Sequence, residues 1–144
     1  MKFKFTKVKG SSIPNHTFLL RPLIDVNFIN GTRNVFTKAL IDTGADGIIL
    51  NIGFAKLLNI NAKDGIQGAT KGIENKPVPV YYHNIEMEIP NFSNSRFSVQ
   101  VGFIDSGSVG VLLGRIDFLD RFKLTFEQYN NSFEIELYPK PSET

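Results

Sequence analysis

The feature that most restricts the fold of this chain is a succession of short segments in which apolar and polar residues alternate. These segments are separated by turn-forming residues, mainly Asn, Gly, Pro and Asp. Alternation with a period of two is typical of a β-strand that buries one face and exposes the other. The sequence therefore predicts a mainly β protein, in the form of a closed or partly open barrel with one or two short helices.

The order of the expected elements follows the turn signals. Asn30-Gly31 predicts a tight hairpin turn, and Pro22 interrupts what is otherwise a long strand or a strand pair. Asn51 could cap a short helix that buries Phe54, Ala55, Leu57 and Leu58, and a second helix is expected over 116–122. A Gly-rich hairpin is expected over 64–80, and a last hairpin turns at Asn130-Asn131. The remaining strands are expected over 18–20, 23–29, 34–41, 47–50, 81–89, 96–104, 110–113, 124–126 and 133–137.

The composition is that of one soluble globular domain. The chain has 144 residues, of which 42% are hydrophobic and 21% are charged, and we find no linker or repeat. We expect a single domain over 1–144, with a disordered tail from 139 to 144. The formal charge of +2 does not indicate a nucleic-acid partner. The local run of Lys2, Lys4, Lys7 and Lys9 is typical of a solvated edge strand.

Several classes of site are disfavoured by the residues that are missing. The absence of cysteine excludes disulfides, thiol catalysis and cysteine-bound metals. His16 and His83 are isolated in the sequence, and no spacing typical of metal ligands, a phosphate loop or a nucleic-acid surface is found. We therefore expect no metal and no cofactor. The first residues lack the apolar core of a signal peptide, and no stretch is long enough to cross a membrane, so a cytoplasmic location is expected.

The segment from Ala39 to Asp46 is the most informative for function. An apolar strand leads directly into Asp42, and Thr43-Gly44 follows, where glycine lets the backbone turn and approach a ligand closely. The same three residues could also be an ordinary β-turn in which Asp42 accepts a local hydrogen bond. A second element, Val111-Leu112-Leu113-Gly114-Arg115, makes the functional interpretation stronger.

Together the two elements resemble the retropepsin-like aspartic proteases. In that family an apolar strand leads into Asp-Thr/Ser-Gly-Ala, and a later apolar-apolar-Gly strand passes beside this turn. The segment 65–72 lies where the family has its flap, a hairpin over the substrate. The resemblance covers roughly 35–137.

The resemblance implies a site and a partner. A second copy of the chain would supply the second carboxylate, giving a homodimer in which the two Thr43 side chains join the turns across the axis. The substrate would be a peptide or protein, bound as an extended strand. The implied roles are catalytic for Asp42, Thr43 and Gly44, substrate-binding for Ala45, Asp46, Ile66, Gly68, Ala69 and Thr70, and supporting for Leu113, Gly114 and Arg115.

Three local features refine these expectations. Asp46 and Arg115 are expected to form a largely buried, two-pronged ion pair, as a matching pair does in viral family members. Asp105-Ser106-Gly107 looks like a second active-site turn, but it follows Asp42 too soon for a second lobe and is interpreted as a surface turn. Residues 122–137 add a hairpin that the viral members lack, and either this hairpin or the strand over 2–8 could form part of the dimer interface.

Two functions remain open at this stage. The leading hypothesis is an endopeptidase that activates a water molecule with two Asp42 carboxylates. The alternative is a non-catalytic peptide-binding or dimerisation module on the same fold. An intact Asp-Thr-Gly favours the enzyme, because a binding module does not need the carboxylate.

Overall fold

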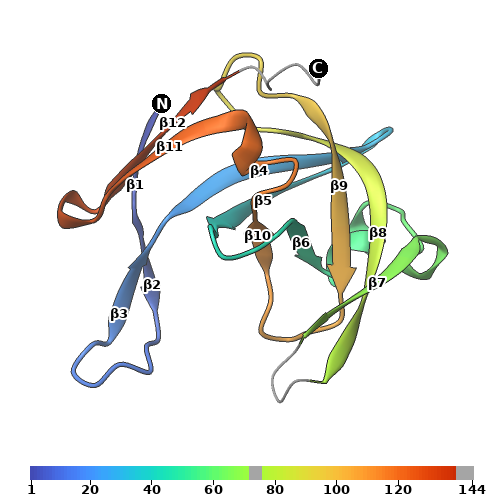
Figure 1. Cartoon of the computed structure of the whole chain (residues 1–144), viewed down its shortest axis with the longest axis horizontal. Helices are drawn as coiled ribbons and strands as arrows, with labels where there is room; N and C mark the ends of the chain where they lie inside the picture. The colour runs from blue at the N-terminus through green and yellow to red at the C-terminus, as the bar shows by residue number, and fades with distance from the viewer. Residues whose placement is uncertain (72–75, 139–144) are drawn as a thin grey trace.

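The structure is a computed structural model of the chain, and it describes residues 1–71 and 76–138 (Figure 1). Two expectations fall outside this part. One is the middle of the Gly-rich hairpin expected over 64–80, at residues 72–75, and the other is the disordered tail expected over 139–144.

The described residues form a mainly β protein with a single short α-helix, as the alternating pattern predicts. The α-helix is α1 (Gly53–Leu57), and short 3-10 turns are η1 (Ala62–Asp64), η3 (Leu119–Arg121) and η4 (Gln128–Asn130). The strands are β1 (Lys2–Lys4), β2 (Thr6–Lys9), β3 (Phe18–Arg21), β4 (Leu23–Asn30), β5 (Arg33–Ile41), β6 (Ile48–Asn51), β7 (Ile66–Lys71), β8 (Pro77–Glu88), β9 (Phe97–Ile104), β10 (Val111–Leu113), β11 (Phe122–Glu127) and β12 (Ser132–Leu137).

The main sheet closes into a barrel. Its strands run in the order β4-β5-β10-β6-β9-β8-β7, and β4 also pairs with β8. This additional pairing, which includes Phe28 opposite Met87, joins the ring, so that β7 extends from β8 outside it. The expectation of a barrel is therefore confirmed, in its closed form.

Inward-facing side chains of the ring fill the barrel. Val26, Phe28, Leu50, Val101 and Phe103 are completely buried. They come from strands β4, β6 and β9, whose alternation in the sequence is what places them on one face. Burial of such large apolar side chains stabilises the barrel that carries the loops at its ends.

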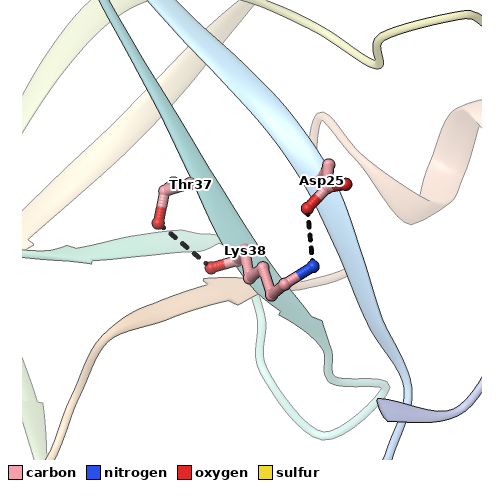
Figure 2. A network of polar contacts seen from close by, with 3 residues as sticks. All are labelled: Asp25, Thr37 and Lys38. Atoms are coloured by element: carbon pink, nitrogen blue, oxygen red, sulfur yellow. Dashed lines mark hydrogen bonds and ion pairs between the residues drawn. The ribbon is translucent and has the colours of Figure 1, made fainter.

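The β4–β5 hairpin brings the informative Asp-Thr-Gly segment to one end of the barrel. Its register places Asp25 opposite Lys38, and the Lys38 Nζ lies 2.9 Å from the Asp25 carboxylate (Figure 2). Both side chains are exposed, so this pair supports the register by no more than a few tenths of a kcal/mol to about 1 kcal/mol. Phe36 is also exposed on this hairpin, whereas Ala39 and Ile41 point into the core.

The N- and C-terminal strands form a second, three-stranded sheet with the order β1-β12-β11. It is held by aromatic side chains, with Phe3 stacked on Phe133 at a centroid distance of 5.1 Å. The lysine-rich first segment thus splits between two sheets, because β2 pairs only with β3. Figure 1 shows the β2–β3 hairpin projecting from the body of the molecule on the same side as the β7–β8 hairpin.

The helical expectations were partly wrong. Ala55 and Leu58 are buried as expected for α1, but Leu57 is 57% exposed. The second helix, expected over 116–122, is replaced by turns and η3. Asp117 adopts a left-handed conformation with φ of 70°, which a regular α-helix does not accommodate. Phe118 nevertheless reaches the core and is completely buried.

Candidate active site

The turn that contains Asp42 is held by hydrogen bonds on both of its sides. Within the turn, the Gly44 amide donates to the Asp42 Oδ1 at 2.9 Å, and the Ala45 amide donates to the Asp42 carbonyl at 3.2 Å. On the outside, the Asp42 amide donates to the Leu113 carbonyl at 3.1 Å. The local hydrogen bond expected of an ordinary Asx turn is therefore present, but the turn is also anchored to β10.

The segment after β10 continues this anchoring. The Arg115 amide donates to the Ala45 carbonyl at 3.0 Å, and the Ile116 amide donates to the Asp46 carbonyl at 2.7 Å. Together with the bond from Asp42 to Leu113, these contacts fasten the backbone of the Asp42 turn to residues 113–116. The expected neighbourhood of the two sequence elements is confirmed by this geometry.

Gly114 lies where the two backbones are in closest contact. A Cβ at this position would clash with the carbonyl oxygens of Gly47 and Ala45. Neither oxygen belongs to a flexible side chain, so relief would require the Asp42 turn itself to move. The structure thus gives a physical reason for glycine after Leu112-Leu113.

A cleft of about 660 Å³ opens beside the Asp42 turn. Asp42 is half-buried at this cleft, whereas Thr43 is exposed and does not line it. Among the residues expected to bind substrate, Ala45, Asp46, Ala69 and Thr70 line it, and Ile66 and Gly68 do not. Among the described residues, the lining consists of Asp42, Gly44, Ala45, Asp46, Gly47, Ile49, Ala69, Thr70, Val78, Tyr82, Ile104, Asp105, Ser106, Ser108, Val109 and Leu112.

The β7–β8 hairpin forms one wall of the cleft, and its most prominent residue was missed by sequence reasoning. Tyr82 lines the cleft, and its ring lies so close to Gly68 that a Cβ there would be 2.8 Å from the Tyr82 Cε2. Gly68 therefore makes room for the Tyr82 ring and does not itself face the cleft. Ile66 is 75% exposed at the start of the hairpin. The only signal in the sequence was the alternation of β8, which does not reveal which face meets a ligand.

The loop after β9 forms another wall. The expected surface turn is present at Gly107 and Ser108, where the Val109 amide donates to the Ser106 carbonyl at 3.3 Å, but Asp105 and Ser106 also line the cleft. The Asn51 side chain donates from Nδ2 to the Ser106 carbonyl at 2.7 Å. The Asn51 amide donates to the Gly110 carbonyl at 2.8 Å, so both ends of the loop are attached to one residue.

Asp46 and Arg115 form an ion pair, but its expected character was wrong. One Arg115 nitrogen, Nη2, lies 2.7 Å from the Asp46 Oδ1, and the two side chains are 63% and 86% exposed, respectively. The pair is therefore neither buried nor two-pronged. The reason is that the backbone of Arg115, and not its guanidinium, makes the close contact with the turn.

The remaining charged and polar groups give no indication of a metal centre. Over residues 1–71 and 76–138, no three His, Cys, Asp or Glu side chains cluster as metal ligands would. The His83 Nε2 lies 2.8 Å from the Ala62 carbonyl oxygen, and the His83 ring packs edge-on against Phe103. These contacts give His83 a structural role. Within the same ranges, no helix is long and apolar enough to span a bilayer.

Comparison with solved structures identifies the fold. Comparison of the sequence with models of known families and with curated protein sequences gives no match. Among solved structures, a retropepsin-like aspartic protease from Rickettsia conorii superimposes with a TM-score of 0.61 at 20% identity, over 78% of this chain and 88% of that one. The chain has a retropepsin-like fold.

Two further structures are similar to this chain. The retroviral protease-like domain of Ddi1 from Leishmania major gives a TM-score of 0.52 at 14% identity, over 85% of this chain and 97% of that domain. EIAV protease in an inhibitor complex gives a TM-score of 0.47 at 20% identity, over 66% and 82% of the two chains. The TM-scores of 0.61 and 0.52 establish the shared fold, and the low identities leave the chemistry to be argued from the residues of the cleft.

The contact at Gly114 generates the first prediction. Gly114→Ala should destabilise the protein by about 1–3 kcal/mol, because the added methyl group would press against two backbone carbonyls of the Asp42 turn. Gly110→Ala is a matched control, since nothing lies within 4 Å of a Cβ at that position. Urea unfolding of both variants measures the difference. Equal stability of the two variants would contradict the close contact.

The exposed ion pair generates the second prediction. Arg115→Ala should lower the free energy of unfolding by less than about 1 kcal/mol, because an exposed ion pair is well solvated when broken. Arg121→Ala should cost more, since Arg121 donates to the Asp117 and Ser98 carbonyls and stacks on Phe97. Urea unfolding of the two variants and the wild type measures both losses of unfolding free energy. A loss of several kcal/mol in Arg115→Ala would show that the pair is desolvated in solution.

Proposed function

We propose that this protein is an aspartic endopeptidase in which Asp42 supplies one carboxylate of a two-carboxylate site. The observation that carries the proposal is the position of Asp42. Asp42 follows the end of β5 and lies in a turn that backbone hydrogen bonds join to the end of β10. It is half-buried and lines the cleft. The retropepsin-like fold supports this assignment.

The chemistry requires two carboxylates that act together. One takes a proton from a water molecule, whose oxygen attacks the carbonyl carbon of the peptide bond. The other, in its acid form, gives a proton to the carbonyl oxygen, which yields a tetrahedral intermediate with two hydroxyl groups. The first carboxyl group then passes its proton to the amide nitrogen, which leaves as an amine, and one hydroxyl of the intermediate returns a proton to the second carboxylate. Two carboxylates about 3 Å apart share one proton because both cannot ionise, and aspartic proteases are the established example.

Asp105 does not meet this requirement within one chain. It lines the same cleft, but it follows β9, and strands β10 and β6 lie between β9 and β5. Asp42 and Asp105 therefore emerge from strands that are three spacings apart in the sheet, and not from neighbouring strands. We expect the two carboxylates of one chain not to share a proton.

A second copy of the chain would supply the missing carboxylate. In a two-fold symmetric dimer, each residue near the axis lies opposite its own mate, so two Asp42 turns would meet there. Thr43 is exposed and does not line the cleft, which suits a contact across that axis. The strand over 2–4 pairs with β12 of its own chain, so β1 and β11 are the outer strands of the sheet that a terminal part of this interface would use.

A non-catalytic peptide-binding module on the same fold is the second candidate. The open cleft beside β7 and β8 would serve it equally well, because an extended peptide can bind without being cleaved. The anchored carboxylate favours the enzyme. The two candidates differ in whether bound peptides are hydrolysed.

The role of Asp42 generates the third prediction. Asp42→Asn should reduce peptide cleavage by about 10²–10⁴-fold, because an amide can act neither as the base nor as the acid. Thermal unfolding should be similar to that of the wild type. Asp25→Asn, at an exposed carboxylate on β4, is the matched control and should cleave normally. Products from a peptide library, identified by mass spectrometry, measure cleavage, and full activity of a pure Asp42→Asn preparation would contradict the proposal.

The homodimer generates the fourth prediction. A ninefold excess of Asp42→Asn should leave only about one tenth of the wild-type chains in active dimers, by random pairing. The activity per wild-type chain should fall accordingly. Saturating peptide removes simple competition for substrate, and an excess of Asp25→Asn should raise total activity instead. A monomeric sedimentation coefficient at concentrations that support cleavage, together with no interference by the inactive variant, would exclude the dimer.

A further inference from the structure

Asp105 is a carboxylate in the cleft that catalysis leaves unused. It is exposed and lines the cleft together with Asp42. Within residues 1–71 and 76–138, its side chain has no hydrogen bond and no ion pair. Asp46, the third acidic residue of the lining, differs because Arg115 neutralises it. Asp105 thus carries into the cleft a negative charge that no side chain of the described residues pairs with.

The backbone that carries Asp105 is fixed. Asn51 donates from its side chain to the Ser106 carbonyl and from its amide to the Gly110 carbonyl. Immediately before Asp105, the Ile104 carbonyl accepts a hydrogen bond of 2.8 Å from the Ile52 amide. A charged group on such an anchored loop loses little backbone entropy when it binds a partner.

The surroundings of Asp105 suit a long side chain with a cationic end. Ile104, Val109 and Leu112 provide an apolar wall in the same lining, and among the residues that the structure describes, no Lys, Arg or His belongs to that lining. Lysine and arginine side chains place their methylene groups on apolar surface and present a charged end to a carboxylate. A neutral side chain would use the wall but leave Asp105 without a partner.

We propose that Asp105 selects peptides with a lysine or arginine side chain close to the bound segment of the substrate. This proposal names a substrate class for the cleft. Its test by peptide cleavage rests on the proposed function, whereas its test by peptide affinity does not require that function. The group recognised is the cation of the side chain, so lysine and arginine peptides should behave alike.

The test compares peptides that differ at one position. A peptide that the wild type cleaves is made with lysine, arginine, norleucine or glutamate at each position near the cleaved bond in turn. At one position, kcat/KM for the basic peptides should exceed that for norleucine about tenfold, as expected of a charge-assisted contact. In Asp105→Asn this ratio should fall to about one, in Asp105→Glu it should largely persist, and in Asp105→Lys the glutamate peptide should become the preferred one.

The controls separate this proposal from the assignment as a protease. Asp64→Asn removes an exposed carboxylate outside the cleft and should keep the wild-type ratio, which excludes an effect of net charge. An unchanged ratio in Asp105→Asn, with peptides still cleaved, would overturn the proposal for Asp105 alone. If no peptide is cleaved, the proposed function fails. Fluorescence anisotropy with the lysine and norleucine peptides then decides, and equal affinities of wild type and Asp105→Asn for both would overturn the selection of a cation.

Discussion

The close contact between two backbones is the constraint on which the rest of the site depends. Gly114 allows the chain after β10 to lie against the carbonyls of Ala45 and Gly47, and hydrogen bonds on either side of it fix the Asp42 turn. A residue other than glycine at position 114 would push the two segments apart, because its Cβ would clash with these carbonyl oxygens. Both segments follow paired strands of the barrel, β5 and β10, and residues at the ends of these strands line the cleft.

Charge in the cleft is distributed over three carboxylates that differ in their surroundings. Asp42 is tied to the amide of its own turn, Asp46 is paired with Arg115, and Asp105 has no partner in the part of the chain that the structure describes. Sequence distance does not reveal this division of roles. Asp105 comes to the same cleft because β9 runs parallel to β6 and ends beside it. In the sheet, strands β10 and β6 lie between β9 and β5, so Asp105 and Asp42 emerge from strands that are not neighbours.

Sequence reasoning found the elements of the site because they are local patterns. Alternation gave the strands, Asn30-Gly31 gave the hairpin, and an apolar run that ends in Asp42-Thr43-Gly44 gave the turn. It failed where an outcome depends on packing. The second helix over 116–122 does not form because Asp117 is left-handed, and the Asp46–Arg115 pair is exposed because the Arg115 backbone takes the close position.

The sequence by itself determined the mainly β class, the order of the strands along the chain and the presence of a single Asp-Thr-Gly, since each follows from the period of the pattern or from a count of residues. Only the tertiary structure decided that the barrel closes through β4 and β8, and that Tyr82 and Asp105 line the cleft while Ile66 does not. The physical reason is that alternation assigns residues to two faces of a strand. Which face meets a ligand is decided by strands that lie far away in the sequence.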